Sequence, residues 1–226
     1  MTISDTAPGA DTVTLLVNGD IVTMNPDRDV LVGGAIAMSG DRIVGVGATS
    51  ELRAAHPGAT EIDLASCVVT PGMIDAHQHL TGDPLIRSCI PDLLPPGASI
   101  FEWSVPVHAA HEPDDDEASA VLSAVEALCA GVTTVVEAGT VAHADQVAAG
   151  LQRLGQRATL GVWGWDIEEG PFTAPADEVL ERQAAVVDAF PAGGLVEGWV
   201  TLVGHDLASD ALLAGAADLA APRAPT

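Results

Sequence analysis

Along the first third of the chain, apolar residues come in short runs separated by glycine, asparagine, serine and aspartate. The runs at residues 13–17, 21–24 and 35–46, the last interrupted by Ser-Gly-Asp, have the length and residue types of strands. The tripeptide Asn-Gly-Asp at residues 18–20 lies between the first two runs, where a β-hairpin would turn. The pattern therefore predicts a meander of short strands, ending in an apolar strand at residues 68–69.

After residue 113 the apolar positions take a helical period. Residues 121, 122, 125 and 128 form one apolar stripe, and three similar segments follow. Gly155 is expected to end the first of these three helices, and Ser209 to be the N-cap of the last. These helices are expected to follow strands at residues 68–69, 132–136, 157–165 and 195–203. Strand followed by helix, four times, predicts an α/β fold with a parallel sheet. A doubly wound sheet is the alternative, which is disfavoured because no glycine-rich phosphate turn follows the first strand.

The charge of the chain excludes several classes of partner. Its 226 residues carry 32 acidic and 8 basic side chains, for a formal net charge of -24, and none of the basic residues is lysine. Such a surface repels nucleic acid and anionic membranes, so neither is expected as a partner. The three cysteines are widely spaced and odd in number, so they are expected to be free thiols in a reducing compartment. With no signal peptide and no apolar run of about 20 residues, the chain is expected to be cytoplasmic.

Two histidines mark the end of the first expected strand of the second half. His77 and His79 follow Pro71-Gly72, and residues at i and i+2 of a strand point to the same face. Two imidazoles on one face can bind one divalent metal ion together. The alternative is that they are unrelated polar residues of a loop. His108 and His111 also have a ligand-like spacing, but they fall in a long proline-rich segment and are expected to be solvated there.

The sequence V-T-P-G-M-I-D-A-H-Q-H-L at residues 69–80 resembles the first-strand signature of the amidohydrolase superfamily. A-G-V-T-T-V-V-E at residues 130–137 is similar to its second-strand region, although Glu137 is not expected to be a ligand. The resemblance implies metal-dependent hydrolases on a (β/α)₈ barrel, with His77 and His79 as ligands of one divalent metal ion, zinc or alternatively iron. It also implies an incomplete TIM-type barrel of about four βα units at residues 69–226, preceded at residues 1–68 by part of a small β-sandwich domain.

His205 belongs to a stretch, V-G-H-D-L-A-S-D, that resembles the end of the fourth strand in deaminase-like and chlorohydrolase-like members. There the histidine contacts the substrate, so His205 is expected to bind substrate; a polar loop residue is the alternative. Gly204 replaces the proline usual at that position, which leaves the details of substrate contact open. Without lysine, the chain has no carbamylated lysine to bridge two metals, so a mononuclear site of the deaminase type fits better.

The activity implied by the resemblance is hydrolysis of carbon–nitrogen bonds other than peptide bonds, by deamination or a related reaction of metal-activated water. In that family the remaining ligands and the proton shuttle lie on strands five to eight, for which the sequence offers no counterpart. We therefore expect the N-terminal half of such an enzyme, inactive alone, with unknown catalytic residues. It would act on a small-molecule substrate and would need a complementing C-terminal half or form a homo-oligomer. A non-catalytic half-barrel that serves as a binding or assembly module is the alternative.

Overall fold

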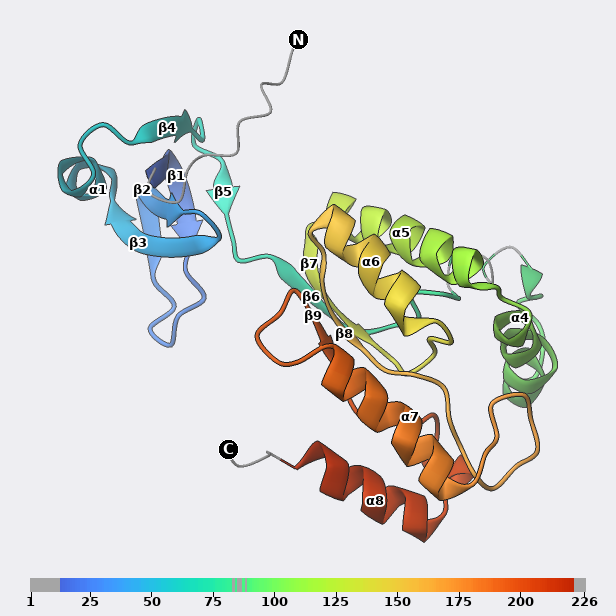
Figure 1. Cartoon of the computed structure of the whole chain (residues 1–226). Coiled ribbons are helices and arrows are strands. Elements are labelled where there is room, and N and C mark those ends of the chain that lie inside the picture. Colours follow the sequence, from blue (N-terminus) through green and yellow to red (C-terminus); the bar gives the residue numbers. More distant parts are fainter. Residues whose placement is uncertain (1–12, 83, 85–86, 88, 222–226) are drawn as a thin grey trace. The chain divides into compact units, whose positions relative to one another are not determined.

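The computed structural model describes residues 13–82, 84, 87 and 89–221, and the chain divides into two compact units, Met1–Pro71 and Gly72–Thr226 (Figure 1). The expected boundary after residue 68 lies close to this division. The assignment of the first unit to part of a β-sandwich domain stays a prediction. Each unit is described by itself below.

The N-terminal unit is built on a five-stranded sheet. Its strand order is β3-β2-β1-β4, and β5 pairs with a later stretch of β1 than β4 does. Antiparallel pairing joins β1, β2 and β3, whereas β4 and β5 run parallel to β1. The core of the unit consists of alternate residues of β1 and β2, namely Leu15, Val17, Ala35 and Ala37. The elements are β1 (Val13–Val22), β2 (Val30–Ser39), β3 (Arg42–Ala48), α1 (Thr49–Ala55), β4 (Thr60–Asp63) and β5 (Val68–Val69).

The first predicted hairpin is wrong, because β1 continues through Asn18 and Gly19. Asn18 has a φ of 61°, and the register of β1 against β2 shifts on either side of Gly19. The two residues therefore form a bulge within one strand, which bends the strand but keeps its pairing on both sides. A Cβ on Gly19 would lie 2.5 Å from the side chain of Leu64, so this position has little room for any larger residue. The second predicted turn is confirmed, since Ser39 pairs with Arg42 across Gly40.

The C-terminal unit contains a four-stranded parallel sheet in the order β6-β7-β8-β9. This confirms the predicted α/β fold with strand–helix repeats. The first strand of the sheet is β6, which begins after Pro71-Gly72; the expected strand at residues 68–69 is β5 and pairs with β1 in the other unit. The strands are β6 (Met73–Gln78), β7 (Val132–Glu137), β8 (Arg157–Leu160) and β9 (Val196–Gly198), and the long helices are α5 (Pro113–Cys129), α6 (Ala144–Leu154), α7 (Ala176–Ala189) and α8 (Asp210–Ala220).

One apolar core joins this sheet to the helices that cover it (Figure 1). The strands contribute buried residues such as Val135 and Leu160, and α5, α6 and α7 contribute small or branched residues such as Ala124, Leu151 and Val186. The predicted helix ends are observed as well. Gly155 ends α6 with a φ of 73°, as a left-handed C-cap does, and the Ser209 hydroxyl accepts the backbone N–H of Leu212 at the start of α8.

The segment between β6 and α5 contains short helical pieces rather than one long loop. They are α3 (Pro96–Ala98), a π-helical segment (Ser99–Ser104) and α4 (Val105–Ala109). Glu112 and Asp115 then form a reciprocal capping box at the start of α5. Throughout the described part of the chain, no helix is both long and apolar enough to cross a bilayer.

The contact of β9 with α7 generates a test of the fold. A Cβ on Gly198 would lie 2.2 Å from the backbone oxygen of Val186, and backbone cannot move aside as a flexible side chain can. We expect Gly198→Ala to lower the free energy of unfolding by about 1–3 kcal/mol or more. Gly97→Ala is the control, because nothing lies within 4 Å of that position. Urea unfolding followed by tryptophan fluorescence checks this, and equal midpoints for the two variants would contradict the packing.

Candidate metal centre

His77 and His79 lie together at the carboxyl end of β6. The Nε2 atoms of their rings are 3.3 Å apart, and the ring planes are nearly perpendicular at 83°. The backbone N–H of His77 donates to the carboxylate of Asp75 at 3.1 Å, which helps to fix the backbone at this strand end. His77 is exposed and His79 is half-buried. The structure thus brings together the two residues that the spacing predicted to share a face.

The separation of the two nitrogens suits two ligands of one metal ion. With metal–nitrogen bonds of about 2.0–2.1 Å and tetrahedral angles, two ligand nitrogens lie roughly 3.3–3.4 Å apart. The observed 3.3 Å matches this spacing, so the pair fits a zinc ion. Among the residues that the structure describes, no group of three or more histidine, cysteine, aspartate or glutamate side chains could hold a metal ion. The described site therefore offers two protein ligands.

A buried chain of hydrogen bonds joins His79 to Thr140 and Glu137. Its Nδ1 lies 3.1 Å from the Thr140 hydroxyl, and that hydroxyl lies 2.6 Å from Oε1 of Glu137. Glu137 is the last residue of β7 and is only 1% exposed. Its Oε2 accepts the backbone N–H of Gly139 at 2.7 Å, and the N–H of Thr140 lies 3.1 Å from both carboxylate oxygens. The carboxylate thus orders the turn after β7 and, through Thr140, reaches the imidazole of His79.

Burial decides the protonation of Glu137. It raises the pKa of this carboxyl from 4.5 to about 7, although the hydrogen bonds from Thr140 and Gly139 act in the opposite direction. The group is therefore close to its midpoint at neutral pH. Glu137 is hydrogen-bonded inside the protein.

A second buried carboxylate, that of Asp116 in α5, joins two loops of the same unit. Its Oδ1 lies 2.8 Å from Nδ1 of His111, and its Oδ2 lies 3.1 Å from Nδ1 of His143. Oδ2 also accepts the backbone N–H groups of Ala142 and His143. Burial disfavours this charge, but the hydrogen bonds from His111 and His143 hold the pKa of Asp116 below its usual range. The expectation that His111 is solvated is wrong, because its side chain is 6% exposed.

His108 is equally buried, at 3% exposure, and is also not the solvated residue that was expected. Its Nδ1 lies 3.4 Å from the hydroxyl of Thr81, and its ring packs edge-on against Trp163. Burial, with the neighbouring His111 as a smaller cause, lowers the pKa of His108 to about 4. The imidazole is therefore neutral at physiological pH, so it acts in packing and hydrogen bonding rather than as a charge.

His205 lies in a short 3-10 helix, His205–Leu207, beyond β9. Its side chain is 87% exposed, and its Nε2 lies 2.9 Å from the carboxylate of the next residue, Asp206. The strand itself ends at Gly198, earlier than residue 203, so His205 follows a connecting segment rather than the strand directly. Its role in substrate binding stays a prediction.

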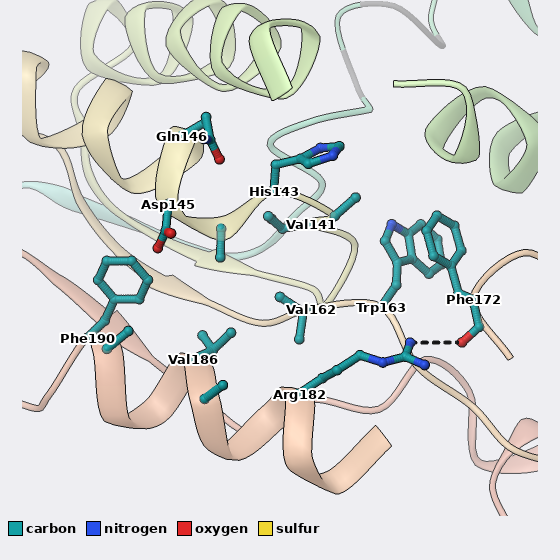
Figure 2. A pocket seen from close by; sticks show the side chains of 14 residues that line it. Val141, His143, Asp145, Gln146, Val162, Trp163, Phe172, Arg182, Val186 and Phe190 are labelled. Carbon is teal, nitrogen blue, oxygen red and sulfur yellow. Dashed lines mark hydrogen bonds between the residues drawn. The ribbon is translucent and has the colours of Figure 1, made fainter. Parts of the chain in front are cut away.

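A cavity of about 490 Å³ lies elsewhere in the unit, between the start of α6 and the face of α7 (Figure 2). His143, Trp163 and Arg182 are among its lining residues, and the stacked rings of Trp163 and Phe172 lie at one side of it. The guanidinium of Arg182 donates to the backbone oxygen of Phe172 at 3.4 Å. His77, His79 and His205 do not line this cavity, so its volume says nothing about the metal pair.

Comparison with known families decides what kind of protein carries this pair. The family profile described as "Amidohydrolase family" matches residues 68–223, which is well over half of the chain. The chain belongs to the amidohydrolase family. A second profile, a bacterial imidazolonepropionase-like composite domain, matches residues 34–59 in the N-terminal unit.

Several amidohydrolase relatives have named activities. A 5-methylthioadenosine/S-adenosylhomocysteine deaminase of Syntrophobacter fumaroxidans is 28% identical over 186 residues, which cover 80% of this chain and 40% of that protein. A 5'-deoxyadenosine deaminase of Methanococcoides burtonii is 30% identical over 165 residues, covering 69% of this chain and 35% of that protein. The chain thus spans well under half the length of these two relatives.

Solved structures show the same fold. A triazine hydrolase from Arthobacter aurescens superposes with a TM-score of 0.81 at 21% identity, over 93% of this chain and 51% of that one. The atrazine chlorohydrolase of Arthrobacter aurescens TC1, solved with zinc, gives 0.78 at 22% identity, over 92% and 50%. At such identities the likeness establishes the amidohydrolase barrel fold, of which this chain spans about half.

Sequence reasoning found the histidine pair of this amidohydrolase but missed the residues that support it. Thr140 carries no motif, and its partner His79 lies 61 residues away along the chain. The only local signal was the position of Glu137 at the end of a β-branched run, where side chains of barrel strands face the functional edge.

The buried carboxyl of Glu137 gives a prediction on pH. Because its pKa in the fold lies above its ordinary value, the stabilisation it contributes is complete below about pH 4.5 and is lost as the pH rises through about 7. The loss is on the order of 3 kcal/mol. Between about pH 5 and about pH 8, the free energy of unfolding of Glu137→Gln should therefore rise relative to that of the parent chain.

Chemical denaturation across this pH range measures the effect. Glu181→Gln, which removes an exposed carboxylate of α7, is the matched control and should follow the parent curve. A difference between Glu137→Gln and the parent chain that does not change with pH would show that Glu137 does not titrate in this range.

Proposed function

We propose that this chain carries the metal-binding histidine pair of a metal-dependent hydrolase that acts on carbon–nitrogen bonds other than peptide bonds. Membership of the amidohydrolase family supports the proposal, but the observation that carries it is local. The Nε2 atoms of His77 and His79 are 3.3 Å apart at the carboxyl end of the first barrel strand, the edge at which barrel enzymes keep their sites. We propose zinc as the metal, with iron as the alternative.

A bound zinc ion would lower the pKa of its water and so make hydroxide available near neutral pH. The part of this chain is to hold that ion through His77 and His79. The substrates of the named relatives suggest small amino-substituted heterocycles and nucleosides as the substrate class. His205, with its exposed imidazole beside Asp206, remains our candidate for contact with the substrate.

The number of ligands limits what the described residues do by themselves. Catalytic zinc sites have three protein ligands in the common cases, and two are present here. The proposal therefore requires further ligands, which a complementing polypeptide or a second copy of the chain would supply. The same observation favours the second candidate, a half-barrel that serves as a binding or assembly module without catalysis.

Metal binding distinguishes the two candidates. We expect zinc to bind the chain weakly, with one ion per chain. His77→Ala and His79→Ala should each lower the affinity by at least about 10–100-fold, because even the loss of an outer-shell partner of a metal ligand typically costs that much. His205→Ala is the control, because its exposed ring is paired with Asp206. Titration calorimetry, or cobalt absorption as a spectroscopic substitute, gives the affinities. Equal affinities for all four proteins would leave the module as the surviving candidate.

We expect no metal-dependent deamination by the 226-residue chain alone, because the proton shuttle and a full ligand set are lacking among its described residues. Ammonia release from 5'-methylthioadenosine in the presence of zinc checks this, with intact mass spectrometry to confirm the chain. Zinc-dependent turnover that His77→Ala abolishes would show that the two-ligand description of the site is wrong.

A further inference from the structure

Two hydrogen bonds link His79 to Thr140 and Thr140 to Glu137, and the groups able to donate a proton determine their direction. At about pH 8 the ionised carboxylate of Glu137 has no proton to donate, so the 2.6 Å contact between Thr140 and Glu137 uses the hydroxyl proton of Thr140. The Thr140 oxygen then has only lone pairs to offer to His79 Nδ1 at 3.1 Å. The proton in that contact must come from the imidazole, which places it on Nδ1.

The opposite arrangement has a different consequence for the metal site. If Thr140 donated its proton to Nδ1, the neutral ring of His79 would carry its proton on Nε2, the nitrogen beside His77. A metal ligand needs a lone pair on the coordinating nitrogen. The direction of one buried hydroxyl therefore decides which nitrogen of His79 can bind a metal ion.

We propose that Glu137 and Thr140 are positioning residues that hold the neutral ring of His79 in its Nδ1–H form, so that the lone pair of Nε2 lies beside Nε2 of His77. The metal-binding consequence rests on the proposed function, but the state of the ring does not. Neither residue touches the metal position; both act through His79. Outer partners of this kind orient a ligand and raise its basicity.

The surroundings of Glu137 restrict it to this role. Its Oε2 is occupied by the N–H of Gly139, and the N–H of Thr140 lies within 3.1 Å of both oxygens. The side chain is 1% exposed, so water cannot take the place of Thr140 as a donor. The carboxylate is therefore held with Oε1 facing the Thr140 hydroxyl, which has His79 on its other side.

A set of substitutions separates this role from simple packing. Thr140→Val removes the hydroxyl at similar volume, and Thr140→Ser restores it. Glu137→Gln presents an amide: if its oxygen keeps the backbone N–H groups, its NH₂ faces Thr140 and turns the hydroxyl proton toward His79. Thr201→Val is the matched control, because the buried Thr201 hydroxyl has no hydrogen-bond partner among the described residues.

Nitrogen-15 NMR of histidine-labelled, metal-free protein at about pH 8 reads the proton position directly, with His79→Ala to assign the resonance. We expect the Nδ1–H form of His79 in the parent chain, Thr140→Ser and Thr201→Val. The Nε2–H form should gain population in Thr140→Val and dominate in Glu137→Gln. An Nε2–H ring in the parent chain, or a ring unchanged in both Thr140→Val and Glu137→Gln, would overturn the proposal, as would an equal change in Thr201→Val.

Zinc affinity gives the second readout. The loss in Thr140→Val should be about 10–100-fold, with recovery in Thr140→Ser. An equal loss in Thr140→Ser and Thr140→Val would reduce Thr140 to a packing residue and overturn the proposal. If the parent chain fails to bind zinc through His77 and His79, the proposed function fails, while the NMR result still decides the state of the ring.

Discussion

The buried carboxylate of Glu137 is the constraint on which the functional edge of the sheet depends. A charge removed from water is costly, and here donors from the backbone and the hydroxyl of the turn that follows β7 offset part of that cost. The turn satisfies the carboxylate through both its backbone and the hydroxyl of Thr140. The conformation of the turn places Thr140 against β6, so the order of one loop is passed to the imidazole of a neighbouring strand.

The histidine pair itself combines order on one side with openness on the other. His79 is half-buried and held through Nδ1, whereas His77 is exposed and is fixed mainly through its backbone contact with Asp75. The proposed metal site would need such asymmetry, because a fully enclosed pair could not exchange ligands with solvent. The loops at the carboxyl edge of a parallel sheet commonly provide it, since the strands below them are rigid.

The sequence predicted the parts of this protein that depend on local patterns. Strand–helix alternation, the Ser209 cap, the left-handed Gly155 and the His77–His79 spacing each depend on residues close together in the chain. The errors in the strands involve pairing at a distance. Residues 68–69 have the pattern of a strand, but whether they pair with β1 or extend β6 is a tertiary choice.

The same limit applies to the polar residues around the site. Asn-Gly-Asp has the composition of a turn, yet pairing with β2 on both sides keeps β1 continuous, so a bulge results. The solvated loop expected for His108 and His111 was wrong because His111 contacts the carboxylate of Asp116 in α5 and the ring of His108 packs against Trp163. Buried polar networks are specified by partners that meet only in the folded chain.

Asp116 has a further consequence for how substitutions in this region combine. One carboxylate accepts hydrogen bonds from His111 in one loop and from Ala142 and His143 in another, so neither loop is energetically independent. Residues that share a buried partner do not have additive effects on stability. Substitution of His111 therefore alters the stability cost of substituting His143, because the two loops share a partner that belongs to neither.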